Sequence, residues 1–313
     1  MVSRFVAKVV VLSLALLCLS GLPGAGPAPA AKVVAASHAP PSLAVVGHVR
    51  GQQPFVTLLC QFPDLYPTLG LPEYYAELLG AAEPGLAHYW AEVSYGQISL
   101  DGSRLTGWYT MPQPSDAYAL RQVDQALLDR LAGDCIAAAD ADVYYPDYFG
   151  INLVFNFCME TAYGGRRRLT LDGQEQIYGV TWLCMGKLGW QATVAHEMGH
   201  AFWLAHSSDG SEEEHSNPWD LMSVCSFCRP HASYGPIAQH PIAYQKDQLG
   251  WIPAERKYVA EAGSTAHISL ERLAQPQTDD YLMAVVPFAD GSDRYYTVEA
   301  RRRVGYDRNL PAD

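Results

Sequence analysis

The sequence predicts an α/β (α+β) fold, in which a twisted mixed sheet with two long helices is followed by a smaller β-rich segment. Three observations support this prediction. Short runs of β-branched and apolar residues recur along the chain, as in buried strands. Two longer stretches carry apolar residues at helical spacing. From Glu255 onward the pattern changes to short β runs, and the 313 residues with 49% hydrophobic content can bury a substantial core.

The first half of the chain alternates between strand and helix patterns. Phe55–Cys60 is β-branched and apolar, which predicts a buried strand. Helices are predicted at Pro72–Gly80 and Pro84–Val93, the second ending near Gly96, a residue that can adopt a left-handed cap conformation. Gln97–Met111 alternates in polarity and is predicted to be a strand or a hairpin.

The middle of the chain contains the two long helices. Ser115–Ala141 has apolar residues at helical spacing behind a Ser-Asp cap, which predicts a long amphipathic helix. Strands are predicted at Ile151–Phe155 and Ile177–Cys184, and the second long helix at Gln191–Trp203. No internal repeat is detectable.

The last third begins with a turn-rich segment that extends to Pro230. A helix is predicted at Pro241–Leu249. The clearest strands after it are Tyr281–Phe288 and Tyr295–Ala300.

The N-terminus has the pattern of an export signal. A basic start is followed by the apolar stretch Val9–Leu19 and by the small residues Ala28 and Ala30, which suit a cleavage site. The apolar stretch is about eleven residues long, whereas a membrane span needs roughly twenty. We therefore expect a signal peptide at 1–30, a linker or short propeptide at 31–53, and a secreted, extracellular protein.

Charge and cysteine content limit the partners and the compartment. The formal charge of -12 argues against a nucleic-acid partner, since phosphate neutralisation needs clustered Lys and Arg. Six cysteines follow the signal segment, and an even number in an exported chain predicts up to three disulfides, whose pairing the sequence leaves open. We expect no stable membrane association after signal removal, and the oligomeric state stays open.

An HExxH motif occupies positions 196 to 200. Four helical residues advance about 400°, so His196 and His200 lie about 40° apart in azimuth and can hold one zinc ion. Glu197 is offset to the side, where it can accept a proton from a water molecule bound to that ion. His206 follows, but a straight helix would carry it about 15 Å along the axis from His196. It reaches the metal only if the chain bends after His200.

These residues resemble the zinc signature HExxHxxGxxH of the metzincin peptidases, and Asp220 to Ser223 resembles the Met-turn beneath the metal in that clan. Further stretches extend the likeness: Ser94-Tyr95-Gly96 with Gly107-Trp108-Tyr109, His240-Pro241 through Lys246 to Gly250-Trp251, and Val298-Glu299 with Gly305-Tyr306-Asp307. In these the chain resembles the immune inhibitor A-like peptidases more closely, with gametolysin-like enzymes next. The resemblance covers about residues 54 to 313. It implies a metallopeptidase catalytic domain at 54–252, with two long helices in a metzincin-like zincin, and a β-rich segment at 253–313 that is expected to be incomplete.

The resemblance also implies a function. His196, His200 and His206 would bind one catalytic Zn²⁺, Glu197 would be the general base, and Met222 would support the floor of the site without touching the metal. The expected activity is that of a secreted zinc endopeptidase acting on protein or peptide substrates. The alternatives are a zinc hydrolase of a non-peptide amide, in a cell-wall or acyl substrate, and a catalytically inactive binding module.

One position departs from the clan pattern. The residue at the bend is Trp203, where the signature has glycine. A tryptophan with positive φ would be strained, so the sequence favours a different backbone path at this turn. His215 and the acidic run Glu212–Glu214 are the alternatives to His206 as third ligand.

Two further hypotheses concern the surroundings of the site. Asp209 and Glu212–Glu214 form an acidic loop, which either binds calcium or is simply solvated. The strand ahead of the zinc helix, Tyr178–Cys184, either pairs with an extended substrate by strand addition or is an internal strand.

Overall fold

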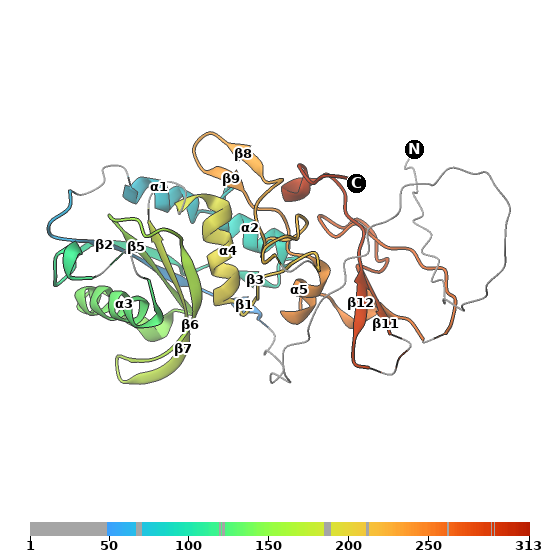
Figure 1. Ribbon diagram of the computed structural model, residues 1–313, viewed down its shortest axis with the longest axis horizontal. Helices are drawn as coiled ribbons and strands as arrows, with labels where there is room; N and C mark the ends of the chain where they lie inside the picture. The colour runs from blue at the N-terminus through green and yellow to red at the C-terminus, as the bar shows by residue number, and fades with distance from the viewer. Residues whose placement is uncertain are drawn as a thin grey trace.

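The computed structural model describes residues 49–66, 71–118, 120, 123–184, 189–210, 213–261, 263–288, 290 and 292–313. The expected signal peptide and most of the expected linker lie outside this part of the chain. The described residues form a mixed α/β structure with one large sheet, several small ones and few helices, as the sequence predicts at this level (Figure 1).

The α-helices are α1 (Leu71–Leu78), α2 (Leu86–Val93), α3 (Gln125–Ala139), α4 (Gln191–Ala201) and α5 (Ala243–Gln248). The strands are β1 (Gly51–Gln52), β2 (Phe55–Gln61), β3 (Ile98–Ser99), β4 (Arg104–Thr110), β5 (Gly150–Phe155), β6 (Tyr163–Leu171), β7 (Gln174–Cys184), β8 (Arg229–His231), β9 (Gly235–Ile237), β10 (Lys257–Val259), β11 (Met283–Pro287) and β12 (Tyr295–Val298). In the described part of the chain, no helix is long and apolar enough to span a membrane.

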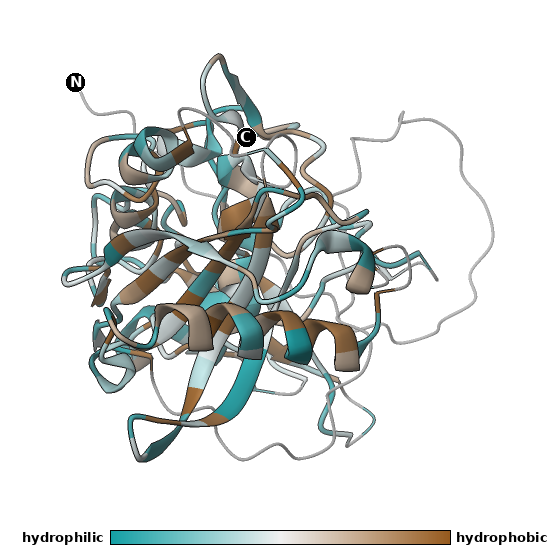
Figure 2. Cartoon of the chain, turned by 90° about the vertical axis from the view of Figure 1, so that its left-hand side faces the viewer, coloured by the Kyte–Doolittle hydropathy of each residue, from teal (hydrophilic) through white to brown (hydrophobic). Residues whose placement is uncertain are grey.

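The large sheet has the strand order β4-β2-β5-β7-β6. Its first four strands are parallel, while β6 pairs antiparallel to β7 and forms an edge. Because the central strands are buried on both faces, alternate residues belong to two different cores. Phe55 and Leu59 face one core with α1, α2 and α4, whereas Val56 and Leu58 face the other with α3. Figure 2 shows the apolar central strands behind the alternating polar and apolar turns of α3.

Helix α3 begins later than predicted. The predicted cap residue Ser115 lies in a short 3-10 turn, and its hydroxyl and backbone N–H donate to the carboxylate of Asp64. The helix instead starts after Asp124, whose carboxylate accepts the N–H of Leu127 at 2.8 Å. The predicted start at Ser115 was therefore wrong, because a contact distant in sequence engages the proposed cap.

Strand β6 was missed in the sequence. It forms a hairpin with β7 through Asp172 and Gly173, which both have positive φ, at 48° and 75°. An Asp-Gly pair between two strands is a strong hairpin signal, so this element was predictable. Gln97–Met111, in contrast, is no hairpin: β3 pairs with β1 and β4 pairs with β2, both in parallel.

Three cysteine pairs lie at disulfide distance, as the even count predicted. Cys60–Cys135 ties β2 to α3, Cys158–Cys184 ties the segment after β5 to the end of β7, and Cys225–Cys228 closes a short loop. The Cα atoms of these pairs are 6.1, 5.2 and 5.2 Å apart, respectively. The first two pairs connect elements distant in sequence, so they restrain the large sheet.

The C-terminal segment forms the three-stranded sheet β10-β11-β12. A buried ionic network joins it to the rest of the chain, since the guanidinium of Arg301 binds the carboxylates of Asp307 at 2.8 Å and Glu299 at 2.8 Å. Asp307 also accepts the backbone N–H of His240, while Glu299 accepts that of Ala243 at the start of α5. Glu299, Arg301 and Asp307 thereby hold the segment that follows Met222.

Candidate metal centre

Helix α4 carries His196, Glu197 and His200, and it packs closely on strands β6 and β7. The close approach depends on two glycines: a Cβ on Gly164 would lie 2.2 Å from the carbonyl oxygen of Glu197, and one on Gly179 would lie 2.6 Å from Cβ of Ala201. Only glycine leaves room for this packing. The sheet therefore sets the depth at which the helix presents its histidines.

The chain bends immediately after this helix. The N–H of Trp203 donates to the carbonyl of His200, and the N–H of Leu204 donates to the carbonyl of Gly199, both at 3.0 Å. Trp203 has a φ of 76°. This is a Schellman termination with tryptophan at the left-handed position where glycine is usual. The expectation of a different backbone path was wrong, because Trp203 adopts the left-handed conformation itself.

Arg166 on β6 contacts this bend. Its guanidinium lies 4.2 Å from the centroid of the Trp203 ring and donates to the carbonyl of Ala201 at 3.2 Å. The tryptophan side chain is 49% exposed on its other side. The stacking of Trp203 on Arg166 and the hydrogen bond from Arg166 to Ala201 both stabilise the bend. These contacts offset part of the strain of a positive φ at Trp203. In the sequence, Arg166 stood out only as part of a basic run.

The two helix histidines have defined tautomers. The Nδ1 atom of His196 lies 2.9 Å from the carbonyl oxygen of Leu221, and Nδ1 of His200 lies 2.8 Å from that of Leu204. A carbonyl only accepts, so both Nδ1 atoms donate a proton. The Nε2 atom of each neutral ring is then unprotonated and carries a lone pair, the state that a metal ligand needs.

The bend brings His206 to the same place. Its Nε2 lies 2.9 Å from Nε2 of His200, and its ring centroid is 5.4 Å from that of His196. Burial, together with the smaller effect of the adjacent His200, lowers the pKa of His196 to about 4 and that of His206 to about 3. These rings are therefore neutral at physiological pH, as ligands must be.

His215 joins the same cluster. One ring nitrogen from each of His196, His206 and His215 can be chosen so that all three lie within 4.8 Å of one another. The ring centroids of His206 and His215 are only 3.8 Å apart. His206 and His215 were alternatives in the sequence, but the structure places both beside the helix histidines.

Glu197 lies beside this cluster and is almost completely buried, with 7% of its surface exposed. Burial alone raises the pKa of its carboxyl group to about 8. A carboxylate with a raised pKa suits a group that accepts and returns protons near neutral pH. A nearby cation would favour its ionised form again.

Met222 lies beneath the helix, fully buried. A Cβ on Gly199 would lie 2.5 Å from its sulfur, so the sulfur packs directly under that glycine. The neighbouring Leu221 accepts the bond from His196, and the carboxylate of Asp220 accepts the N–H of Ile242 at 3.0 Å. The segment resembling a Met-turn thus supports the floor of the cluster and orients one ring.

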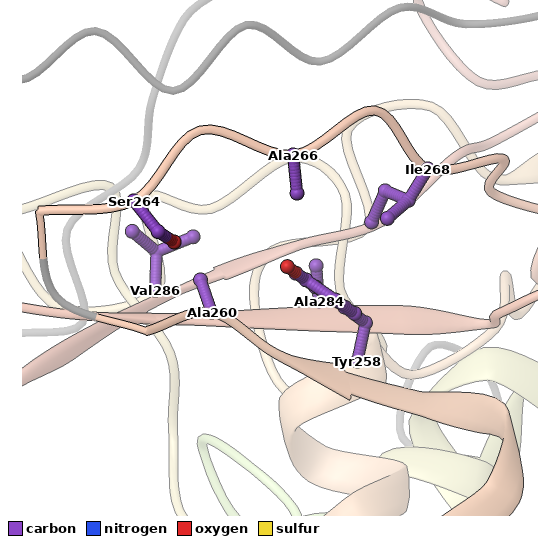
Figure 3. A pocket seen from close by; sticks show the side chains of 7 residues that line it. All are labelled: Tyr258, Ala260, Ser264, Ala266, Ile268, Ala284 and Val286. Atoms are coloured by element: carbon purple, nitrogen blue, oxygen red, sulfur yellow. The ribbon is translucent and has the colours of Figure 1, made fainter.

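A cavity of about 470 Å³ opens beside His196, Glu197 and His215. Its wall includes Trp190 and the Cys225–Cys228 disulfide, and more of the wall is apolar than polar. A second hollow, near β10 and β11, measures about 10 Å³, room for about one water molecule (Figure 3). The cavity beside the histidines is therefore the candidate binding site.

The residues present fit a zinc ion. Imidazole nitrogens are among the ligands that Zn²⁺ prefers, and the rings of His196 and His200 are fixed by backbone carbonyls in the metal-binding tautomer. The acidic loop differs. The carboxylate of Asp209 accepts a bond from Ser216, Glu213 and Glu214 are exposed, and Glu212 lies outside the described residues. Calcium binding there stays a prediction.

The strand before helix α4 is internal. Over Gly179–Cys184, β7 pairs with β5 on one side, and through Trp182 it pairs with β6 on the other. The hypothesis that this strand accepts a substrate by strand addition was wrong, since its backbone groups are already used. The edge of the sheet next to α4 is β6, whose outer side pairs with no strand in the described part of the chain.

No protein-family model and no curated protein matches the chain. The interpretation of the site therefore depends on its geometry and chemistry.

Proposed function

We propose that the chain is a secreted zinc-dependent endopeptidase of the metzincin type. The observation that carries the proposal is the bend at Trp203, which brings Nε2 of His206 to 2.9 Å from Nε2 of His200. Two histidines on one helix are common in any core. A third that reaches them through a helix termination, above a buried methionine and beside a buried glutamate, is the arrangement that the zinc signature requires.

His196, His200 and His206 would hold the ion. When bound, zinc supplies Lewis acidity, which lowers the pKa of water and polarises a substrate carbonyl. Glu197 would take up the proton from the attacking water and deliver it to the leaving amine. Its burial removes competing water and raises its pKa, so that the carboxylate is basic enough for the first transfer.

The surroundings suit a peptide substrate. The outer edge of β6, which pairs with no other strand among the described residues, offers backbone groups to an extended chain in strand addition. The mostly apolar cavity beside Glu197 is large enough for one substrate side chain. The exposed apolar side chain of Val224, in the loop after the Met-turn segment, lines this cavity. Three disulfides are compatible with an extracellular location.

The test is metal analysis of purified protein together with a general protease assay, with and without a chelator. We expect one zinc per chain, chelator-sensitive cleavage and inhibition by hydroxamates. Glu197→Gln should retain zinc and lose hydrolysis, while Glu255→Gln, an exposed glutamate in another part of the fold, should change neither. Full activity of Glu197→Gln would exclude the proposed role of the base.

The same experiment separates the rival functions. A zinc hydrolase of a non-peptide amide would bind zinc and hydroxamate but leave peptides intact. An inactive binding module would bind peptides without cleaving them, although Glu197 and all three histidines are retained.

A further inference from the structure

His215 is a fourth imidazole at the candidate metal centre. Its ring centroid is 3.8 Å from that of His206 and 6.1 Å from that of His196. One nitrogen of its ring and one ring nitrogen of each of these two residues all lie within 4.8 Å of one another. The three-ligand site proposed above leaves this ring without a role.

The backbone holds His215 in this position from two sides. Its carbonyl accepts the N–H of Val224 at 3.1 Å, which ties it to the loop after the Met-turn segment. Its neighbour Ser216 bonds to Asp209 near the start of the same loop. The residue itself has a φ of 63°, a conformation that few side chains adopt without a tertiary reason. The backbone position of His215 is therefore set by the fold.

The role of the His215 ring depends on how many ligands the metal ion takes. Zinc in proteins is usually bound by four ligands in a tetrahedron, and catalytic sites leave one of the four positions to water or substrate. Four imidazoles would occupy every position. His215 also lines the cavity beside Glu197, so a group that enters this cavity comes into contact with this ring.

We propose that His215 is a dissociable fourth ligand, which closes the coordination of the metal in the resting protein and withdraws when an oxygen ligand, such as a hydroxamate or a peptide carbonyl, enters the cavity. This inference rests on the proposed function. In the proposed resting state, His215 itself, and not a propeptide, would block the metal and keep the enzyme inactive.

The test uses the full chain loaded with Co²⁺, whose visible absorption reports the number of ligands. The variants are His215→Asn and His215→Gly, because both residues tolerate the positive φ that alanine would resist. His267→Asn, an exposed histidine away from the site, is the matched control.

In the wild type and in His267→Asn we expect an intense four-coordinate spectrum that changes only at high acetohydroxamate concentration. In both His215 variants the absorption should fall, as expected for a site that takes up water, and acetohydroxamate should bind at least about tenfold more tightly. Zinc should bind them about 10- to 100-fold more weakly, the range seen when groups supporting a metal site are removed.

Two outcomes overturn the proposal. Spectra and hydroxamate affinities equal to those of the wild type would show that His215 is not a ligand. Complete loss of metal from both variants would make it an obligatory ligand and not a dissociable one. Absence of any metal from the wild type is a different result, because it would refute the proposed function and this inference with it.

Discussion

Replacing Trp203 tests how the bend that carries His206 is stabilised. In an ordinary conformation, alanine is more stabilising than glycine by about 0.4–1 kcal/mol, since glycine loses more backbone freedom on folding. At a φ of 76° the order should reverse, because a left-handed conformation costs a side chain roughly 1–2 kcal/mol that glycine avoids. Trp203→Gly is therefore expected to be more stable than Trp203→Ala.

The size of the effect follows from the contacts. Tryptophan is 49% exposed, so about half of its surface, roughly 100 Å², is buried and contributes up to about 2.5 kcal/mol. Stacking under Arg166 adds about 0.5–1 kcal/mol. Trp203→Ala should thus lose about 3 kcal/mol, and Trp203→Gly about 1 kcal/mol less.

Urea unfolding of the zinc-loaded proteins measures both values. Tyr144 provides the control pair, since it is a half-exposed aromatic residue with an ordinary φ of -92°. Tyr144→Ala should be more stable than Tyr144→Gly, the opposite order from that at Trp203. If alanine is as stable as glycine at position 203, the left-handed bend does not exist in solution and the argument for His206 loses its basis.

Three other predictions concern packing, charge and metal. Gly199→Ala should lower the free energy of unfolding by about 1–3 kcal/mol, because the added methyl group would clash with Met222. Gly133→Ala in α3 is the control: it has open space at its Cβ and should raise the free energy of unfolding by about 0.5–1 kcal/mol. Equal effects of the two substitutions would contradict the packing at the floor of the site. Burial lowers the pKa of Lys246 to about 7 from an ordinary 10.5, so the unfolded chain binds more protons between these values and stability should rise with pH there. Lys246→Met should flatten that rise by at most about 1.4 kcal/mol per pH unit, measured by urea unfolding at pH 7.5 and 9.5. The same pH dependence of stability in the variant and the wild type would argue against the lowered pKa of the buried amine. Removing metal with a chelator should lower the melting temperature, since an ion present at a thousand times its Kd stabilises the folded state by about 4 kcal/mol. Calorimetry measures this change. An unchanged melting temperature would indicate that the native fold binds no ion.

Local patterns in the sequence were sufficient for most of the elements. The β-branched and apolar runs Phe55–Cys60 and Ile151–Phe155 predicted β2 and β5, because a strand buried on both faces needs apolar residues at consecutive positions. The four-residue spacing of His196 and His200 placed both rings on one side of α4, since helical geometry depends only on near neighbours. The Asp-Gly pair before β7 carried an equally local signal for the hairpin with β6.

Other features depended on contacts between residues distant in sequence. The start of α3 moved because Asp64 engages Ser115, and the partners of the cysteines followed from which elements the sheet brings together. Neither kind of contact produces a recognisable pattern of residue types in the neighbouring sequence. The same limitation applied to β7, whose internal position depends on pairing with strands before and after it.

The sequence by itself determined the chemistry available at the site: two helical histidines, a glutamate between them, and further histidines and a methionine downstream. Only the tertiary structure decided how these groups meet. Trp203 adopts a left-handed conformation that its own preferences oppose, and His215 adopts another, so that both His206 and His215 reach the helix histidines. The reason is physical: intrinsic backbone preferences amount to about 1–2 kcal/mol per residue, and packing contacts such as that with Arg166 are large enough to offset them.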